Sequence, residues 1–259
     1  MTGGARGIGR AIGVRLVECG YRVVLTDVDP AVAGTAEQIG AVAGLEHDVR
    51  DEAAHRRVAQ EAARFGEVRV WVNNAGVGDD GGLEELSGEA VRRLVEVNLL
   101  GTVWGMRAAL RAFADDGTGD VVNIASLSGF GPVPGLSVYG ATKAAVLSLT
   151  ASVQAETPPG VRLHALCPDG VDTDLVSAMD PAGLATALNH SGGGLLHPER
   201  VAAEAVALLG ARRVVRTVPG WRGAVARASG LAPSVFVHAL PIVVRLGRLG
   251  QRRVASSRG

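Results

Sequence analysis

Strand-like and helix-like segments alternate along most of this chain, and this alternation is the feature that most restricts its fold. The segments with apolar, β-branched patterns typical of strands include YRVVLTD, VRVWVNNAG, GDVVNIAS and VRLHALCP. Those with helical patterns include residues 7–19, 51–65 and 137–156. Short connections between the two types are typical of a parallel sheet covered by helices on both faces. We therefore predict an α/β fold with a doubly wound parallel sheet.

A glycine-rich turn opens the chain, where MTGGARGIGR places Gly3, Gly7 and Gly9 before a helical segment. Such glycines let backbone N–H groups approach a pyrophosphate, and the N-terminus of the next helix favours negative charge. The spacing is not the G-x-G-x-x-G pattern, so a purely structural turn is the alternative. The turn indicates a dinucleotide site only if other residues support it.

Asp27 supports the dinucleotide interpretation, because it ends the next predicted strand, 18 residues after Gly9. An acidic side chain at this place can bind the adenosine ribose hydroxyls, and it repels a 2′-phosphate. NAD is therefore favoured over NADP, although Arg6 within the turn points the other way. Asp27 could instead cap a helix or form a turn, and Asp29 is the alternative ribose ligand.

Tyr139 and Lys143 form a second constellation, in SVYGATKAAV. The chain has 26 basic residues, yet Lys143 is its single lysine, and Tyr139 is one of two tyrosines. On a helix the two side chains lie one turn apart on the same face. A nearby ammonium favours the phenolate, so we expect Lys143 to lower the pKa of Tyr139 and make it a general acid/base. An ordinary surface pair is the alternative.

Together these segments resemble the short-chain dehydrogenase/reductase family. The resemblance runs over roughly residues 2–210 and is carried by TGGARGIG, DV at 48–49, NNAG at 73–76, Asn98 in VNLLG, Ser126 in NIASLSG, and YGATK. It implies a Rossmann-like fold and hydride transfer to or from a nicotinamide cofactor. It also implies a homo-oligomer.

The resemblance implies catalytic roles for Asn98, Ser126, Tyr139 and Lys143. Tyr139 would transfer the proton, Lys143 would hold the nicotinamide ribose, and Ser126 would bind the substrate oxygen, with Ser128 as the alternative. Asn98 would hold a water in a proton relay, or it is a helix-interior polar residue that bonds a neighbouring turn.

The same resemblance implies a set of cofactor contacts. Asp48 would bind the adenine amino group, unless it is the N-cap of the helix that starts near Asp51. Asn74 would lie on the adenosine side, or else Asn73 and Asn74 are plain turn formers. The full set is Gly3, Arg6, Gly7, Ile8, Gly9, Asp27, Asp48, Val49, Asn74, Ala75, Gly76, Tyr139, Lys143, Pro168, Gly170, Val171 and Thr173.

Two departures from the family pattern stand out. The family has Pro-Gly after its sixth strand, whereas CPDGV places Asp169 after Pro168, which puts the nicotinamide contacts of this loop in doubt. The family also has a buried strand before the glycine turn, and here only Met1 precedes the turn. Burying about five apolar side chains there would contribute about 1.5–3 kcal/mol each. We therefore expect the first strand to be missing from this sequence and the natural product to begin upstream.

Composition limits the partners. Residues 205–259 hold ten Arg and no acidic residue, so residues 1–204 carry a net −10. We divide the chain into a Rossmann-like catalytic domain, residues 1–218, and a basic, partly apolar extension, residues 219–259. The extension either contacts an anionic membrane surface or packs on the chain or a subunit partner. With 3% aromatic residues, nucleic acid is not expected.

The two cysteines form no disulfide framework and no metal spacing, and we expect a cytoplasmic protein without a bound metal. The predicted function is an NAD(H)-dependent alcohol dehydrogenase or carbonyl reductase, acting on a fairly apolar alcohol or ketone. The alternatives are the same chemistry with NADP(H), or a nucleotide-binding protein without turnover.

Overall fold

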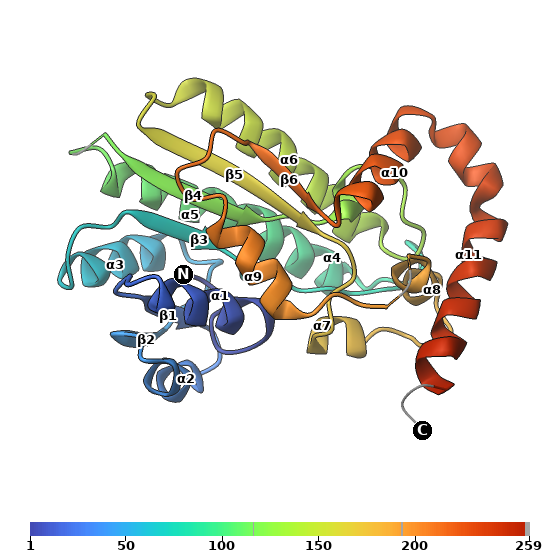
Figure 1. The fold of residues 1–259 in the computed structure, drawn as a ribbon, viewed down its shortest axis with the longest axis horizontal. Helices are drawn as coiled ribbons and strands as arrows, with labels where there is room; N and C mark the ends of the chain where they lie inside the picture. The colour runs from blue at the N-terminus through green and yellow to red at the C-terminus, as the bar shows by residue number, and fades with distance from the viewer. Residues whose placement is uncertain (116, 193, 257–259) are drawn as a thin grey trace.

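A computed structural model describes residues 1–115, 117–192 and 194–256 (Figure 1). Four parallel strands form one sheet in the order β3 (Val70–Asn73), β4 (Gly119–Ile124), β5 (Val161–Pro168) and β6 (Val215–Val218). A second parallel pair, β1 (Val24–Asp27) and β2 (Ala43–Glu46), lies beyond β3. The predicted parallel α/β sheet is therefore confirmed, and its strands fall within the segments that the sequence indicates.

Helices cover both faces of the sheet because successive strand residues point to opposite sides. Trp71 and Val121 enter a core cluster with helices α3 and α5, while their neighbours Val72 and Val122 enter another with α1 and α9. The helices are α1 (Gly7–Glu18), α2 (Val32–Ile39), α3 (Glu52–Ala63), α4 (Gly88–Leu94), α5 (Gly101–Ala112), α6 (Ser137–Glu156), α7 (Asp174–Ser177), α8 (Leu184–His190), α9 (Pro198–Val206), α10 (Gly220–Leu231) and α11 (Pro233–Ser256).

The seam between β1 and β3 is filled by Met1 and Thr2. The α-amino group of Met1 donates to the Val24 carbonyl at 3.0 Å, and Thr26 N–H donates to the Met1 carbonyl at 2.8 Å. On the other side Thr2 N–H donates to the Val72 carbonyl at 3.0 Å. Beyond Met1 the seam widens into a groove of about 210 Å³ between the two strands. The place of the expected first strand thus holds two residues, which join the two sheets.

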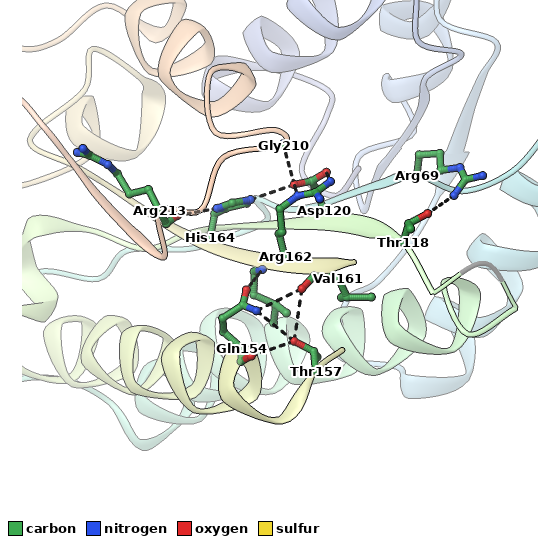
Figure 2. A network of polar contacts seen from close by, with 11 residues as sticks. Arg69, Thr118, Asp120, Gln154, Thr157, Val161, Arg162, His164, Gly210 and Arg213 are labelled. Atoms are coloured by element: carbon green, nitrogen blue, oxygen red, sulfur yellow. Dashed lines mark hydrogen bonds and ion pairs between the residues drawn. The ribbon is translucent and has the colours of Figure 1, made fainter. Parts of the chain in front are cut away.

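A polar network fastens the amino ends of β4, β5 and the segment before β6 (Figure 2). The Asp120 carboxylate accepts two hydrogen bonds from Arg162 at 2.8 Å, one from His164 at 3.1 Å and one from Gly210 N–H at 3.0 Å. Burial alone would raise the pKa of Asp120, but these donors lower it overall. The opposite edge of the sheet, where the strands end, carries the predicted site residues.

Helices α10 and α11 continue from β6 and pack on the rest of the chain. Helix α10 contacts β6, and α11 lies against α8. Within the described part of the chain, no helix combines the length and the apolarity needed to cross a bilayer.

Candidate active site at the carboxyl edge of the sheet

The glycine turn is closed so tightly that two positions have no room for a side chain. A Cβ at Gly9 would lie 1.8 Å from the Gly3 carbonyl oxygen, and one at Gly3 would lie 2.7 Å from the Asn74 side chain. Gly7, with φ +55°, has the left-handed backbone that only glycine adopts readily. The turn leads directly into α1, so its backbone and the helix N-terminus form a cradle that fits a pyrophosphate.

Asp27 lies beside this turn, at the carboxyl end of β1. One of its carboxylate oxygens accepts from Ala5 N–H at 3.0 Å, and the other accepts from Asp29 N–H at 3.1 Å. Arg6 is held away from it by ion pairs with Asp29 at 3.6 Å and Asp174 at 3.1 Å. The cationic side chain of the turn is therefore already neutralised by two acids.

Asn74 connects the end of β3 to the glycine turn. Its side-chain amide donates to the carbonyls of Thr2 and Gly3, at 3.1 and 2.8 Å. The Thr2 hydroxyl accepts from the backbone N–H groups of both Asn74 and Ala75. Asn74 is thus more than a turn former, and Thr2 is a positioning residue that the sequence analysis did not single out. Its place directly before the glycines was the available signal.

Asp48 and Val49 lie between β2 and α3. Asp48 forms a bidentate ion pair with Arg50, whose guanidinium hydrogen bonds lower the pKa of that carboxyl. The N-cap of α3 is Asp51, which accepts from Ala53 N–H at 2.8 Å. The alternative that Asp48 caps this helix is therefore wrong, because Asp51 takes that place. Val49 is buried, and its carbonyl is within 3.0 Å of His55 Nε2.

Tyr139 and Lys143 lie on one face of α6, as their spacing predicts, close to the end of β4. Lys143 is buried and donates to the Ile124 carbonyl at 2.9 Å, and its Nζ lies 5.6 Å from the centre of the Tyr139 ring. Ser126 follows β4, and it lines the same cavity as Tyr139. The Ser126 hydroxyl donates to that of Ser128 at 3.2 Å, so both serines stay candidates for the substrate oxygen.

The pKa of Tyr139 is raised and not lowered as predicted, and Lys143 is not among the groups that shift it. Burial raises the pKa of the Tyr139 phenol to about 12, although the nearby Ser126 hydroxyl acts the other way. Burial also lowers the pKa of Lys143 to about 8. The sequence argument considered only the attraction between an ammonium and a phenolate, and it left out the free energy of taking both charges out of water.

Asn98 lies in a π-helical turn, Val95–Leu100, that interrupts the long helical region between α4 and α5. Its side chain accepts from Val77 N–H and donates to the Val77 carbonyl, each at 2.9 Å. A Cβ built on Gly76 would meet Asn98 Oδ1 at 3.3 Å and Lys143 Nζ at 3.6 Å. Asn98 therefore bonds the turn after β3 and also lies near Lys143; its part in a proton relay stays a prediction.

A cavity of about 120 Å³ lies at this edge of the sheet. Its walls bring together most of the predicted site: Ile8, Asn74, Gly76, Ser126, Tyr139, Lys143, Pro168, Gly170, Val171 and Thr173. The cavity also has an apolar side that includes Leu136, Leu175, Val176 and Met179. Nine predicted residues do not line this cavity: Gly3, Arg6, Gly7 and Gly9 in the glycine turn, Asp27 at the end of β1, Asp48 and Val49 between β2 and α3, Ala75 after β3, and Asn98 in the π-helical turn.

Asp169, the departure from the family pattern, also lines the cavity and has a partner on α10. Arg222 Nε donates to Asp169 Oδ2 at 2.6 Å, and both side chains are only about 15% exposed. The same guanidinium donates to Ser191 Oγ at 3.0 Å and to the Leu188 carbonyl at 3.2 Å. Sequence reasoning missed Arg222, because its partner is 53 residues away.

Comparison with known proteins gives consistent matches. The family model for the short chain dehydrogenase matches residues 1–182. A sorbitol dehydrogenase of Cereibacter sphaeroides is 37% identical over 185 residues, covering 70% of this chain and 72% of the relative. A 2,5-dichloro-2,5-cyclohexadiene-1,4-diol dehydrogenase of Sphingobium indicum is 34% identical over 188 residues, covering 70% and 75%.

Two solved structures share the fold. One is a short chain dehydrogenase/reductase from Burkholderia phymatum in complex with NAD, with TM-score 0.79, 28% identity, and coverage of 88% of this chain and 90% of that one. The other is an alcohol dehydrogenase from the archaeon Thermococcus sibiricus complexed with 5-hydroxy-NADP, with TM-score 0.70, 29% identity, and coverage of 84% and 93%.

Proposed function

This chain belongs to the short-chain dehydrogenase/reductase family, and we propose that it transfers a hydride between NAD(H) and a fairly apolar alcohol or ketone. The observation that carries the proposal is the shared cavity, in which Ser126, Tyr139 and Lys143 meet beside the glycine turn. When bound, the nicotinamide accepts or supplies the hydride. The chain's own residues place the substrate oxygen and move its proton.

The preference for NAD rests on the charges around the turn. Asp27 points its carboxylate at the backbone of the turn, where a 2′-phosphate would meet a negative charge. Arg6, the one cation within the turn, is paired with Asp29 and Asp174. Because these two acids already pair with Arg6, its guanidinium does not favour a 2′-phosphate. NAD(H) is therefore the favoured cofactor.

The substrate oxygen would lie between Ser126 and Tyr139. Because burial raises the pKa of Tyr139 to about 12, the phenol carries its proton at neutral pH and can donate it to a developing alkoxide. Lys143, whose Nζ lies 5.6 Å from the centre of the Tyr139 ring, would hold the nicotinamide ribose. Alcohol oxidation requires the reverse proton transfer, so it is favoured at higher pH.

The apolar character of the substrate follows from the cavity wall. Leu136, Leu175, Val176 and Met179 form one side of the cavity, while its polar side chains include the residues assigned to the substrate oxygen and the cofactor. Apolar surface stabilises an apolar substrate by about 25 cal/mol for each Å² removed from water. Lys143 is the one cation among the described lining residues, and because it would hold the nicotinamide ribose, it leaves no counter-charge for a phosphorylated or multiply anionic substrate.

The test measures the reduction of NAD and NADP with a panel of secondary alcohols, together with the reverse reaction on ketones. Tyr139→Phe should lower kcat by at least about a hundredfold, as expected for loss of general acid/base catalysis. NADH binding, followed by fluorescence, should not change. Tyr21→Phe is the matched control, since Tyr21 is the only other tyrosine. Full turnover in Tyr139→Phe, or NADP preferred over NAD, would contradict the proposal.

A further inference from the structure

Helix α11 carries an apolar stripe on its exposed side. The stripe consists of Val235, Ile242, Leu246 and Leu249, whose side chains are 46–70% exposed. Their spacings of seven, four and three residues place all four on one face of a helix with 3.6 residues per turn. An amphipathic helix normally turns such a stripe toward a core, so this one lacks a partner within the described residues.

The other face of α11 packs on α8, and this contact determines that the stripe points away from the rest of the chain. Val244 is buried on that side. A Cβ at Gly247 would lie 1.8 Å from the Ala187 carbonyl oxygen, and one at Gly250 would lie 2.6 Å from that of His190. Both glycines therefore allow close packing of the two helices. Figure 1 shows α11 at the outer edge of the molecule, beside α8, so the stripe faces away from the chain.

The charges around the stripe select the partner. Arg245 and Arg248 are exposed on α11, and residues 205–259 hold ten Arg without a single Asp or Glu. A second copy of this helix would bring no acidic side chain to pair with these arginines. Residues 1–204 carry a net charge of −10, so a negative surface would repel this part of the molecule and attract the basic C-terminal part. An anionic lipid surface matches both the apolar stripe and the arginines.

We propose that α11 binds the surface of an anionic membrane, with the stripe in the acyl boundary and its arginines at the headgroups. The helix lies in the plane of the interface, since its other face stays packed on α8. The binding does not depend on hydride transfer or on any residue of the cavity.

The experiment measures cosedimentation of the full chain with phosphatidylcholine vesicles, alone or with about 30% phosphatidylglycerol, at low and high salt. The stripe variant is Val235→Ser, Ile242→Ser and Leu246→Ser. Its control is Val28→Ser with Leu83→Ser, which changes equally exposed apolar residues elsewhere. The charge variant is Arg245→Gln with Arg248→Gln. Circular dichroism and light scattering verify the fold and the subunit number of each variant.

The wild type and the control should bind vesicles that contain phosphatidylglycerol, and the stripe variant should not. The charge variant should bind roughly thirtyfold more weakly, which corresponds to about 1 kcal/mol per arginine. Three results would overturn the proposal: no binding of the wild type at low salt, equal binding to both vesicle types, or equal binding by the stripe variant. A stripe variant that changes the subunit number while vesicle binding persists would assign the stripe to a contact between copies.

Discussion

When the chain is produced with Met1 as its first residue, the buried amino group of Met1 should add a pH-dependent contribution to the free energy of unfolding, and acetylation of this amine should remove that contribution. Burial lowers the pKa of this amine from 8.0 to about 5. An acetylated Met1 keeps its N–H, and therefore its hydrogen bond to the Val24 carbonyl, but has no charge to desolvate. The groove of about 210 Å³ beyond Met1 has room for the acetyl group.

The magnitude follows from the difference between the two pKa values. Between pH 5 and pH 8 the unfolded chain binds more protons at this amine than the folded chain, so folded-state stability rises with pH in this window. At pH 7 the folded protein is destabilised by roughly 1–2 kcal/mol, and at pH 5 by roughly 3–4 kcal/mol, from about 1.4 kcal/mol per pKa unit. At pH 9 both states are neutral, and the penalty is close to zero.

The assay is urea unfolding of the free and the Nα-acetylated protein at pH 5, 7 and 9, followed by circular dichroism. An acetyltransferase specific for N-termini leaves Lys143 unmodified, and mass spectrometry verifies that Met1 and one acetyl group are present. Because every other titrating group is common to both chains, the difference in unfolding free energy isolates the amine. A difference that is equal at the three pH values, or that grows toward pH 9, would refute the reasoning.

Four further outcomes are expected. Gly9→Ala should abolish NADH binding measured by fluorescence, because its Cβ would lie 1.8 Å from a carbonyl oxygen of the turn. Asp169→Asn and Arg222→Gln should each raise KM for the ketone by roughly five- to tenfold, and the double variant should be no worse than either, since contacting residues couple by about 0.5–3 kcal/mol. Asp120→Asn should lower the free energy of unfolding by about 2–4 kcal/mol in urea titrations and leave cofactor affinity unchanged. Because burial raises the pKa of Tyr139 to about 12, kcat/KM for alcohol oxidation should rise about tenfold per pH unit from pH 6 to 8. Over the same range kcat/KM for ketone reduction should not change. An oxidation rate independent of pH would contradict this.

The sequence was sufficient for those parts of the fold and site that depend on local pattern. Alternating strand and helix segments predicted the parallel sheet, and the glycines predicted a turn before a helix, which the structure has at Gly3–Gly9. The helical spacing of Tyr139 and Lys143 placed both on one face of α6, as observed. In each case a single segment of chain determines the geometry.

What the sequence did not predict depends on contacts between distant segments. The lone lysine suggested a lowered pKa for Tyr139, but the direction is set by how deeply β4, α6 and the loops bury the phenol. Arg50 pairs with Asp48, and Asp51 caps α3. Both contacts depend on the folded conformation of the turn, so the sequence could not show which acid caps the helix. The sequence shows the helical spacing of the apolar stripe on α11. It does not show which face of α11 packs on α8, because that depends on the close approach at Gly247 and Gly250.

Arg222, on helix α10, contacts two other stretches of the chain. It binds Asp169 after the end of β5, and it binds Leu188 and Ser191 at the end of α8. A deletion that starts after β6 would therefore leave a carboxylate at the cavity wall without its counter-charge and two loop contacts without their donor. Shortened forms of this protein should be judged by the shape of the cavity as well as by whether they fold. In this chain helix α10 supports the wall of the pocket through Arg222, although the matched family model ends at residue 182.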